Sequence, residues 1–155
     1  KGMPNVMIEF PNEEDITNFI VALKVNEGLY GNHWFHFSFS IPEEWPRSPP
    51  IVRIKDRIWH PNIECIQDSN AQGRIDVSTL SIHRPFFLIY EIIVSLQFVL
   101  INPNPNDALN VNAAHEYIQN YESFKAHVNS YLEEMNDDDD DDDDNEDKNH
   151  NKILS

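Results

Sequence analysis

The sequence predicts one α+β domain, in which an antiparallel sheet packs against helices. Strand-like segments fill the first half of the 155-residue chain and helical patterns fill the second. This segregated order is typical of α+β domains, whereas α/β domains alternate the two kinds of element. A chain of this length with 40% hydrophobic residues can bury one sizeable core but not two.

Four segments carry the strand signal. Segment 33–41 alternates strictly between apolar and polar residues, which predicts one buried face. The other three are rich in β-branched residues or short and apolar, and cover 6–10, 18–25 and 51–54. The turn 26–32 holds two glycines and the loop 42–50 is rich in proline, so we expect sequential strands to pair antiparallel.

The second half predicts three helices. Segment 87–100 is almost entirely apolar but too short and too interrupted to span a bilayer, so we expect a buried helix. The prolines of 102–107 end it. Asn112 is the expected N-cap of the next helix. A last amphipathic helix follows from apolar residues at i, i+4, i+7 and i+8, namely Phe124, Val128, Tyr131 and Leu132.

The acidic charge is concentrated at the C-terminus. The chain has a net charge of −16, and residues 136–155 contribute −8 of it through ten acidic residues and two lysines. A run of eight aspartates cannot bury apolar surface, so we expect a domain over 1–135 and an acidic disordered tail over 136–155. Such a chain repels nucleic acid and anionic membranes, and a basic protein surface fits it better as a partner.

Cys65 is the only cysteine, so no internal disulfide can form. This is consistent with a reducing compartment, and the expected location is the cytoplasm or nucleus. The seven histidines lack the spacing of a metal site, and the sequence has no phosphate-binding glycine loop. We therefore expect neither a metal nor a cofactor.

Three stretches resemble the ubiquitin-conjugating enzymes when they are taken together and in order. They are "PEEWPRSPPIVRI…IWHPNI", "QGRIDVSTL" and "NPNPNDALNVNAAHEYIQNYESF". The likeness runs from about Pro4 to Leu132, and "NEGLYGNHWFHFSF" is most similar to the neddylation branch. The resemblance implies a four-stranded antiparallel meander backed by helices and a carrier of thioester-linked modifiers. The family's first helix has no counterpart before Pro4.

The family's catalytic cysteine matches Asp76. In the family the cysteine follows a G-x-[IV] step, and here Gly73 and Ile75 stand in that step directly before Asp76. A thiolate is a strong nucleophile whose thioester can pass an acyl group to an amine. A carboxylate is a weak one, and an acyl-aspartate is a mixed anhydride open to hydrolysis. We therefore expect Asp76 to be inert, with no stable intermediate.

The resemblance also assigns the surroundings of the missing cysteine. His60 and Pro61 are vestiges of the "HPN" motif, and Asn62 matches a residue that helps to stabilise the oxyanion. Asp107 matches an acidic residue placed near the incoming lysine. A purely structural role remains the alternative for both, with Asn62 closing a turn and Asp107 capping a loop.

Other features depart from the family pattern. Segment 64–73 is about six residues longer than usual, and the tryptophan expected after the site is absent from 81–87. Arg47 and Ser48 occupy positions where ubiquitin-type members often present an aromatic and a basic residue to a ligase. The surface beside the site is therefore rebuilt.

Cys65 lies three residues after Asn62 and is a candidate relocated nucleophile. The alternative is a small loop side chain without catalytic role. The neighbouring carboxylates of Glu64 and Asp68 disfavour a thiolate, which favours this second interpretation.

Three functions remain open. The leading hypothesis is an inactive conjugating-enzyme variant that binds ubiquitin or a ubiquitin-like modifier, a conjugating or activating enzyme, or a ligase. The alternative is an active conjugating enzyme that works through Cys65, or whose natural cysteine was replaced by Asp76. In the third, the acidic tail recruits basic partners and the domain presents it.

Overall fold

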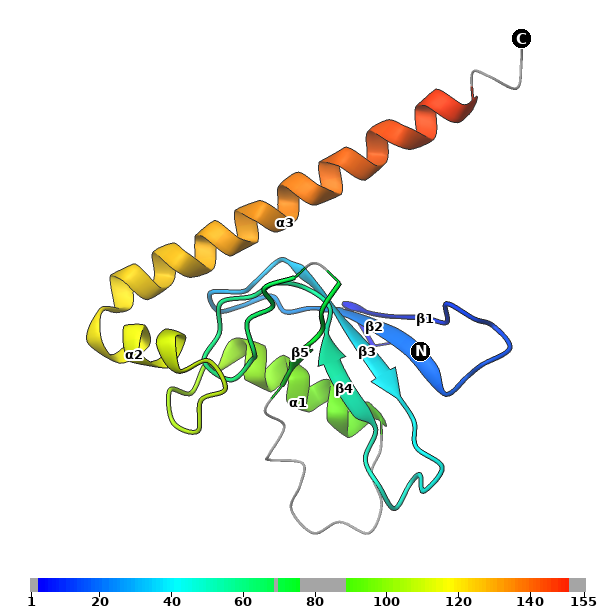
Figure 1. Ribbon diagram of the computed structural model, residues 1–155, viewed down its shortest axis with the longest axis horizontal. Coiled ribbons are helices and arrows are strands. Elements are labelled where there is room, and N and C mark those ends of the chain that lie inside the picture. Colours follow the sequence, from blue (N-terminus) through cyan, green and yellow to red (C-terminus); the bar gives the residue numbers. More distant parts are fainter. Residues whose placement is uncertain (1–2, 69, 76–88, 151–155) are drawn as a thin grey trace.

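The strands form one antiparallel meander, followed along the chain by the helices (Figure 1). The computed structural model describes residues 3–68, 70–75 and 89–150, with side chains as far as Asp137. The sheet order is β1-β2-β3-β4-β5, and every neighbouring pair is antiparallel. The strands are β1 (Val6–Glu9), β2 (Asn18–Lys24), β3 (Trp34–Ser40), β4 (Ile51–Ile54) and β5 (Gly73–Arg74). The helices are α1 (Ile89–Ile101), α2 (Val111–Gln119) and α3 (Tyr121–His150). The predicted α+β class is confirmed.

The inner face of the sheet forms one wall of the core. Phe35, Phe37 and Phe39 of β3 are at most 1% exposed, as their alternation with polar residues predicts. Apolar side chains of α1 join the same buried cluster, among them Ile92 and Leu96. The residues that alternate with them in β3 are partly exposed, so one face of the sheet packs on the core and the other faces solvent.

The sheet has five strands, whereas the sequence predicts four. The fifth, β5, holds only Gly73 and Arg74 and pairs with the end of β4. Two residues are too few to show a periodicity of two, and glycine is depleted in strands. Gly73 is required here because a Cβ atom would lie 2.6 Å from the carbonyl oxygen of Glu64.

The first helix is buried on one side only. Ile92, Ile93, Leu96 and Leu100 of α1 are buried, but three other apolar residues of this helix are exposed. These are Tyr90, Val94 and Phe98. The prediction that the whole apolar run is buried is therefore wrong for this outer face.

The N-cap of α2 is Asn110 and not the predicted Asn112. The Asn110 side chain accepts a hydrogen bond from the backbone N–H of Ala113 at 3.1 Å. The backbone N–H of Asn110 donates to the carbonyl oxygen of Pro61 at 3.0 Å, which holds the chain extended before the helix starts. Since Pro61 is remote in sequence, this tertiary contact sets a helix start that local pattern does not reveal.

The C-terminal helix α3 packs through the predicted residues. Phe124, Val128 and Leu132 are buried, and Tyr131 is half-buried. The helix continues through the aspartates to His150, where the sequence predicts disorder from Asn136. The division into a domain over 1–135 and a tail over 136–155 stays a prediction. Among the described residues, no helix has the length and hydropathy needed to cross a membrane.

Candidate active-site region

His60 begins the turn 60–63 that follows β4, and it is completely buried. Its Nδ1 accepts the backbone N–H of Asn62 at 3.0 Å, so the ring hydrogen is on Nε2, which donates to the carbonyl oxygen of Val99 at 2.8 Å. Burial lowers the pKa of His60 to about 4, against the opposing effect of the Val99 carbonyl. The imidazole is therefore neutral and structural, and not a proton donor or acceptor for substrate.

Tyr30, from the turn between β2 and β3, supports this histidine. Its ring centroid is 5.0 Å from that of His60, and its hydroxyl donates a hydrogen bond to the carbonyl oxygen of Trp59. Tyr30 is 0% exposed, and burial raises the pKa of its phenol well above the ordinary value of a tyrosine. The sequence analysis missed Tyr30, whose only signal is a tyrosine between the two glycines of the hairpin turn.

Asn62 connects the turn to the loop between α1 and α2. Its Nδ2 donates to the carbonyl oxygen of Asn104 at 2.9 Å, and its Oδ1 accepts the backbone N–H of Asn104 at the same distance. We call this pair of bonds the amide clamp. The carbonyl oxygen of Pro61 accepts further backbone hydrogen bonds from Leu109 and Asn110. The turn and the loop are thus one rigid unit.

The amide clamp supports a structural role for Asn62 and leaves one N–H of its side chain free to donate a further hydrogen bond. A carboxamide has two N–H hydrogens, and the contact with Asn104 uses one of them. Asn62 is 6% exposed. The remaining hydrogen is a neutral donor held in a fixed position, which is the chemical character of an oxyanion-stabilising group.

Asp107 lies on the same loop, three residues beyond Asn104, with its side chain exposed. Its backbone has a φ of 57°, a left-handed conformation that glycine adopts most readily and that asparagine and aspartate also adopt. The Asn62–Asn104 hydrogen bonds therefore join the loop that carries Asp107 to the "HPN" turn. The proposed effect of Asp107 on an incoming amine stays a prediction.

Asp76 itself lies outside the described residues, as does segment 81–87. The residue before it is placed: Ile75 forms an antiparallel β-bridge with Ile63, which directly follows Asn62. Position 76 therefore comes directly after a residue that is fixed beside the "HPN" turn.

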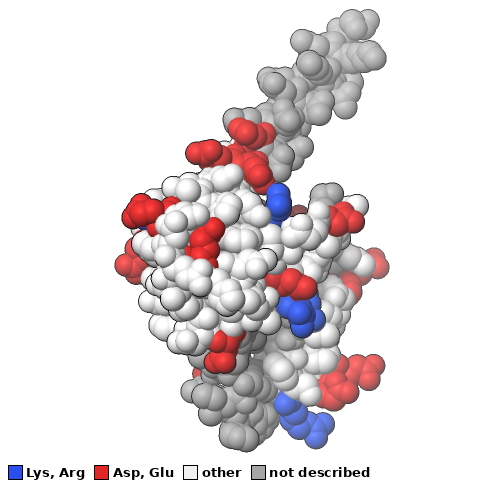
Figure 2. Space-filling model, turned by 60° about the vertical axis from the view of Figure 1, so that its left-hand side comes forward, with Lys and Arg blue, Asp and Glu red and all other residues white. Residues whose placement is uncertain are grey.

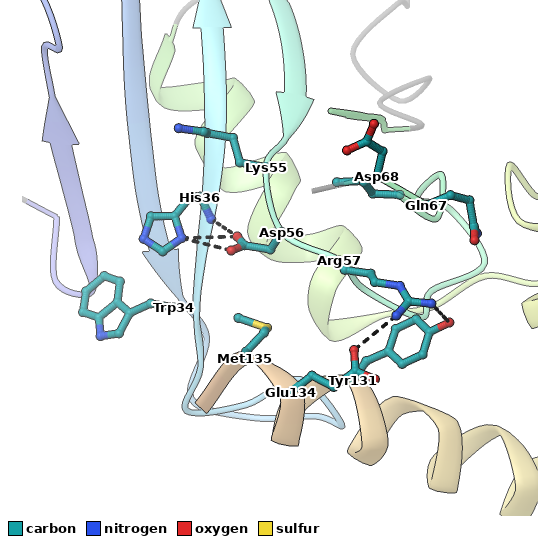
Figure 3. Close-up of a pocket in the computed structure, with 11 residues that line it drawn as sticks. Trp34, His36, Lys55, Asp56, Arg57, Gln67, Asp68, Tyr131, Glu134 and Met135 are labelled. Atoms are coloured by element: carbon teal, nitrogen blue, oxygen red, sulfur yellow. Dashed lines mark hydrogen bonds and ion pairs between the residues drawn. The ribbon is translucent and has the colours of Figure 1, made fainter. Parts of the chain in front are cut away.

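Cys65 faces a different part of the molecule. Its Sγ is 3.8 Å from the hydroxyl of Tyr131 on α3. The Arg57 guanidinium packs on the ring of Tyr131 at 4.5 Å, and donates to its hydroxyl at 3.2 Å and to Glu134 at 3.3 Å (Figure 3). The thiol is thus directed toward α3, whereas the Asn62 amide is directed toward the loop after α1.

Glu64 and Asp68, the two carboxylates close to Cys65 in sequence, form hydrogen bonds with backbone or side-chain N–H groups. Glu64 accepts the backbone N–H of Arg74 at 2.9 Å and its Nε at 3.2 Å, and these hydrogen bonds lower the pKa of the Glu64 carboxyl. Asp68 accepts the backbone N–H of Asn70 at 3.0 Å. The contacts of both carboxylates are therefore local to the loop 64–74.

Comparison with known proteins agrees with this geometry. Residues 1–132 match the family model described as "Ubiquitin-conjugating enzyme". The chain is 33% identical over 129 residues to the NEDD8-conjugating enzyme UBC12 of Yarrowia lipolytica, covering 82% of this chain and 69% of that protein. It is 32% identical to the NEDD8-conjugating enzyme Ubc12 of Dictyostelium discoideum, covering 81% of this chain and about half, 52%, of that protein.

A solved structure supports the same assignment. S. cerevisiae Ubc12 superposes with a TM-score of 0.70 at 26% identity, over 83% of this chain and 70% of that chain. The meander, the "HPN" turn joined to the loop after α1 and the match over residues 1–132 lead to one conclusion. This chain belongs to the ubiquitin-conjugating enzyme family and is similar to its neddylation branch.

Proposed function

We propose that this chain binds components of a ubiquitin-like conjugation pathway and does not itself carry the modifier. The observation that carries the proposal is Asp76 at the position where the family has its cysteine. The bridge between Ile63 and Ile75 supports the match, because it fixes the preceding residue beside the "HPN" turn.

The chemistry of Asp76 explains why this chain would not transfer the acyl group of a modifier. A carrier must hold the modifier through a bond that survives in water and still reacts with an amine, as a thioester does. The carboxylate of Asp76 is a poor nucleophile, and the anhydride that it would form is lost to water. The "HPN" turn needs no nucleophile, since its hydrogen bonds hold the fold together.

The relatives indicate which components to test first. The relatives from Yarrowia lipolytica and Dictyostelium discoideum are called NEDD8-conjugating enzymes, and the chain is also 33% identical over 125 residues to the ubiquitin-conjugating enzyme E2 S of Homo sapiens. A NEDD8-type modifier is therefore the first candidate and ubiquitin the second. The other candidates are an activating enzyme, a true conjugating enzyme and a ligase, and the predicted cellular location remains the cytoplasm or nucleus.

Binding without transfer can be measured directly. Isotope-labelled chain is titrated separately with NEDD8, ubiquitin, a NEDD8-conjugating enzyme, an activating enzyme and a ligase, and its amide chemical shifts are followed. The proposal expects saturable shifts with at least one component and no covalent product when activating enzyme and ATP are added. Absence of binding to every component, activating enzyme and ligase included, contradicts it.

An active enzyme that uses Cys65 is the second candidate. Two observations favour it: the thiol is half-exposed, and Asn62, the residue that matches the family's oxyanion-stabilising position, is retained. A charging reaction resolved on a non-reducing gel separates the two candidates, with Cys65→Ser as the matched control. A thiol-sensitive adduct that disappears in Cys65→Ser establishes the second candidate, and no adduct in either chain supports the first.

The acidic tail gives the third candidate. If the tail recruits basic partners, deletion of residues 136–155 abolishes their capture. Capture that is unchanged by the deletion excludes this role.

A further inference from the structure

The outer face of the sheet is basic, although the chain is strongly acidic. Among the outward-facing residues of the five strands, Lys24, Arg53 and Arg74 are basic and only Glu9 is acidic. Lys55 follows β4 and is exposed. We call Lys24, Arg53, Lys55 and Arg74 the basic sheet face. Elsewhere acidic side chains predominate, as Figure 2 shows for one side of the molecule.

The positive charge of this face is only partly neutralised. Arg53 and Arg74 are direct cross-strand partners, an arrangement in which like charges repel. Glu64 pairs with Arg74 at 3.2 Å, whereas the Arg53 guanidinium donates to the carbonyl oxygen of Val52. Neither Arg53 nor Lys55 forms an ion pair with any residue in the described part of the chain, although the charge of Arg53 also acts on the Glu64 carboxylate. The face therefore attracts an anionic ligand.

A groove of about 370 Å³ crosses this face. Arg53 and Lys55 are its charged lining residues, and no acidic side chain lines it. Its other lining residues are the polar Asn18, Ser38, Ser40 and Gln72 and the apolar Pro11, Phe19, Ile20, Phe39 and Ile51. Cations next to neutral donors, with no carboxylate, fit an extended acidic peptide.

Lys55 connects this groove to the middle of the C-terminal helix α3. It also lines a cavity of about 410 Å³, whose opposite wall includes Met135 of α3 (Figure 3). Three carboxylates line this cavity. Asp56 contacts His36 and Glu134 pairs with Arg57, whereas Asp68 accepts the backbone N–H of Asn70. The basic sheet face therefore begins where α3 leaves the body of the domain.

The aspartate run, Asp137–Asp144, starts two residues after Met135. In the structure α3 carries these residues away from the sheet (Figure 1). Aspartate is a poor helix former, and like charges repel at i+3 and i+4. Helix beyond Asn136 is therefore easily unwound. Eight extended residues span roughly 26 Å, which is enough to cross a few adjacent strands.

We propose that the aspartate run unwinds from α3 and binds along the basic sheet face of its own molecule, from Lys55 toward Arg53 and Arg74. Tethering at Met135 gives the run a millimolar effective concentration at this face. The bound run covers the face, so another acidic ligand must displace it. Because the contacts are exposed ion pairs, they weaken as salt is added.

Carbodiimide cross-linking tests the contact in the unmodified chain. This reagent joins a lysine to a carboxylate only when the two are in contact. As a helix, α3 carries Asp141 roughly 9 Å and Asp144 roughly 13 Å along its axis beyond Met135. Cross-links from Lys55 to Asp141–Asp144 are therefore expected only when the run folds back. Lys125, which pairs with Glu122 at 2.9 Å, is the control lysine.

The expected result is a Lys55 cross-link to Asp141–Asp144 within one molecule, reduced at least fivefold by 0.5 M salt. The Lys125–Glu122 product reports reagent activity at both salt concentrations. Mixed light and heavy isotope chains identify cross-links between molecules. The absence of the Lys55 product at low salt, or its occurrence only between molecules, overturns the proposal.

Competition with a free peptide gives an independent test. A full-length variant in which Asp137–Asp144 are replaced by asparagine leaves the basic sheet face uncovered. An octa-aspartate peptide is expected to bind this variant at least tenfold more tightly than the unmodified chain, with shifts at Arg53 and Lys55. Adding Arg53→Gln and Lys55→Gln should remove this binding. Equal affinity for the variant and the unmodified chain overturns the proposal.

Discussion

Acidification from pH 7 to pH 5 should destabilise this protein through His60. The imidazole is fully buried and its pKa is lowered from 6.5 to about 4, so the folded state keeps it neutral while the unfolded chain takes up a proton. Its contribution to stability is complete above pH 6.5 and is lost progressively as the pH falls toward 4. The linkage relation gives a loss of roughly 2 kcal/mol between pH 7 and pH 5.

Urea unfolding at several pH values measures this loss, with His60→Gln as the matched control. The variant removes the titrating group, so its free energy of unfolding should fall by roughly 2 kcal/mol less than that of the unmodified chain over the same range. Other groups titrate equally in both chains and cancel in the difference. Imidazole nitrogen shifts provide a second readout, and His60 should still be neutral at pH 5. Parallel pH profiles, or a protonated His60 at pH 5, refute the reasoning.

Four substitutions test the framework around the site by urea unfolding. Asn62→Ala removes both bonds of the amide clamp and should cost about 1–3 kcal/mol, whereas Asn104→Ala keeps the backbone atoms that form the clamp and should cost under about 1 kcal/mol. Equal costs for the two contradict the clamp. Gly73→Ala places a Cβ atom 2.6 Å from the Glu64 carbonyl oxygen and should destabilise by about 1–3 kcal/mol; a neutral effect means that β5 is not packed as described. Asp107→Gly relieves a φ of 57° and should leave stability unchanged or raise it by up to about 1 kcal/mol, and a clear loss indicates a stabilising contact of the carboxylate.

The local sequence pattern is sufficient to predict the buried residues of elements with strong periodicity. The strict alternation in β3 predicted which phenylalanines are buried, and apolar spacing predicted the buried residues of α3. β5 was missed because two residues, one of them Gly73, show no periodicity. The outer side of α1 was predicted as buried because a uniformly apolar run does not show which side faces water.

The contacts that organise the site join residues far apart in sequence. Asn62 and Asn104 are 42 residues apart, and Tyr30 and Trp59 are 29 apart. No short-range pattern encodes such pairs. The "HPN" motif indicated where the site lies, but only the fold shows that His60 is buried and that Asn62 connects two loops.

The central claim is that this chain belongs to a family of acyl carriers and cannot itself be charged. Intact-mass measurement after incubation with activating enzyme, ATP and NEDD8 or ubiquitin tests it most directly, with Asp76→Cys as the matched variant. The account predicts that the unmodified chain keeps its own mass and that Asp76→Cys gains the mass of one modifier through a thiol-sensitive bond. A mass increase of one modifier on the unmodified chain, at Asp76, at Cys65 or elsewhere, contradicts it.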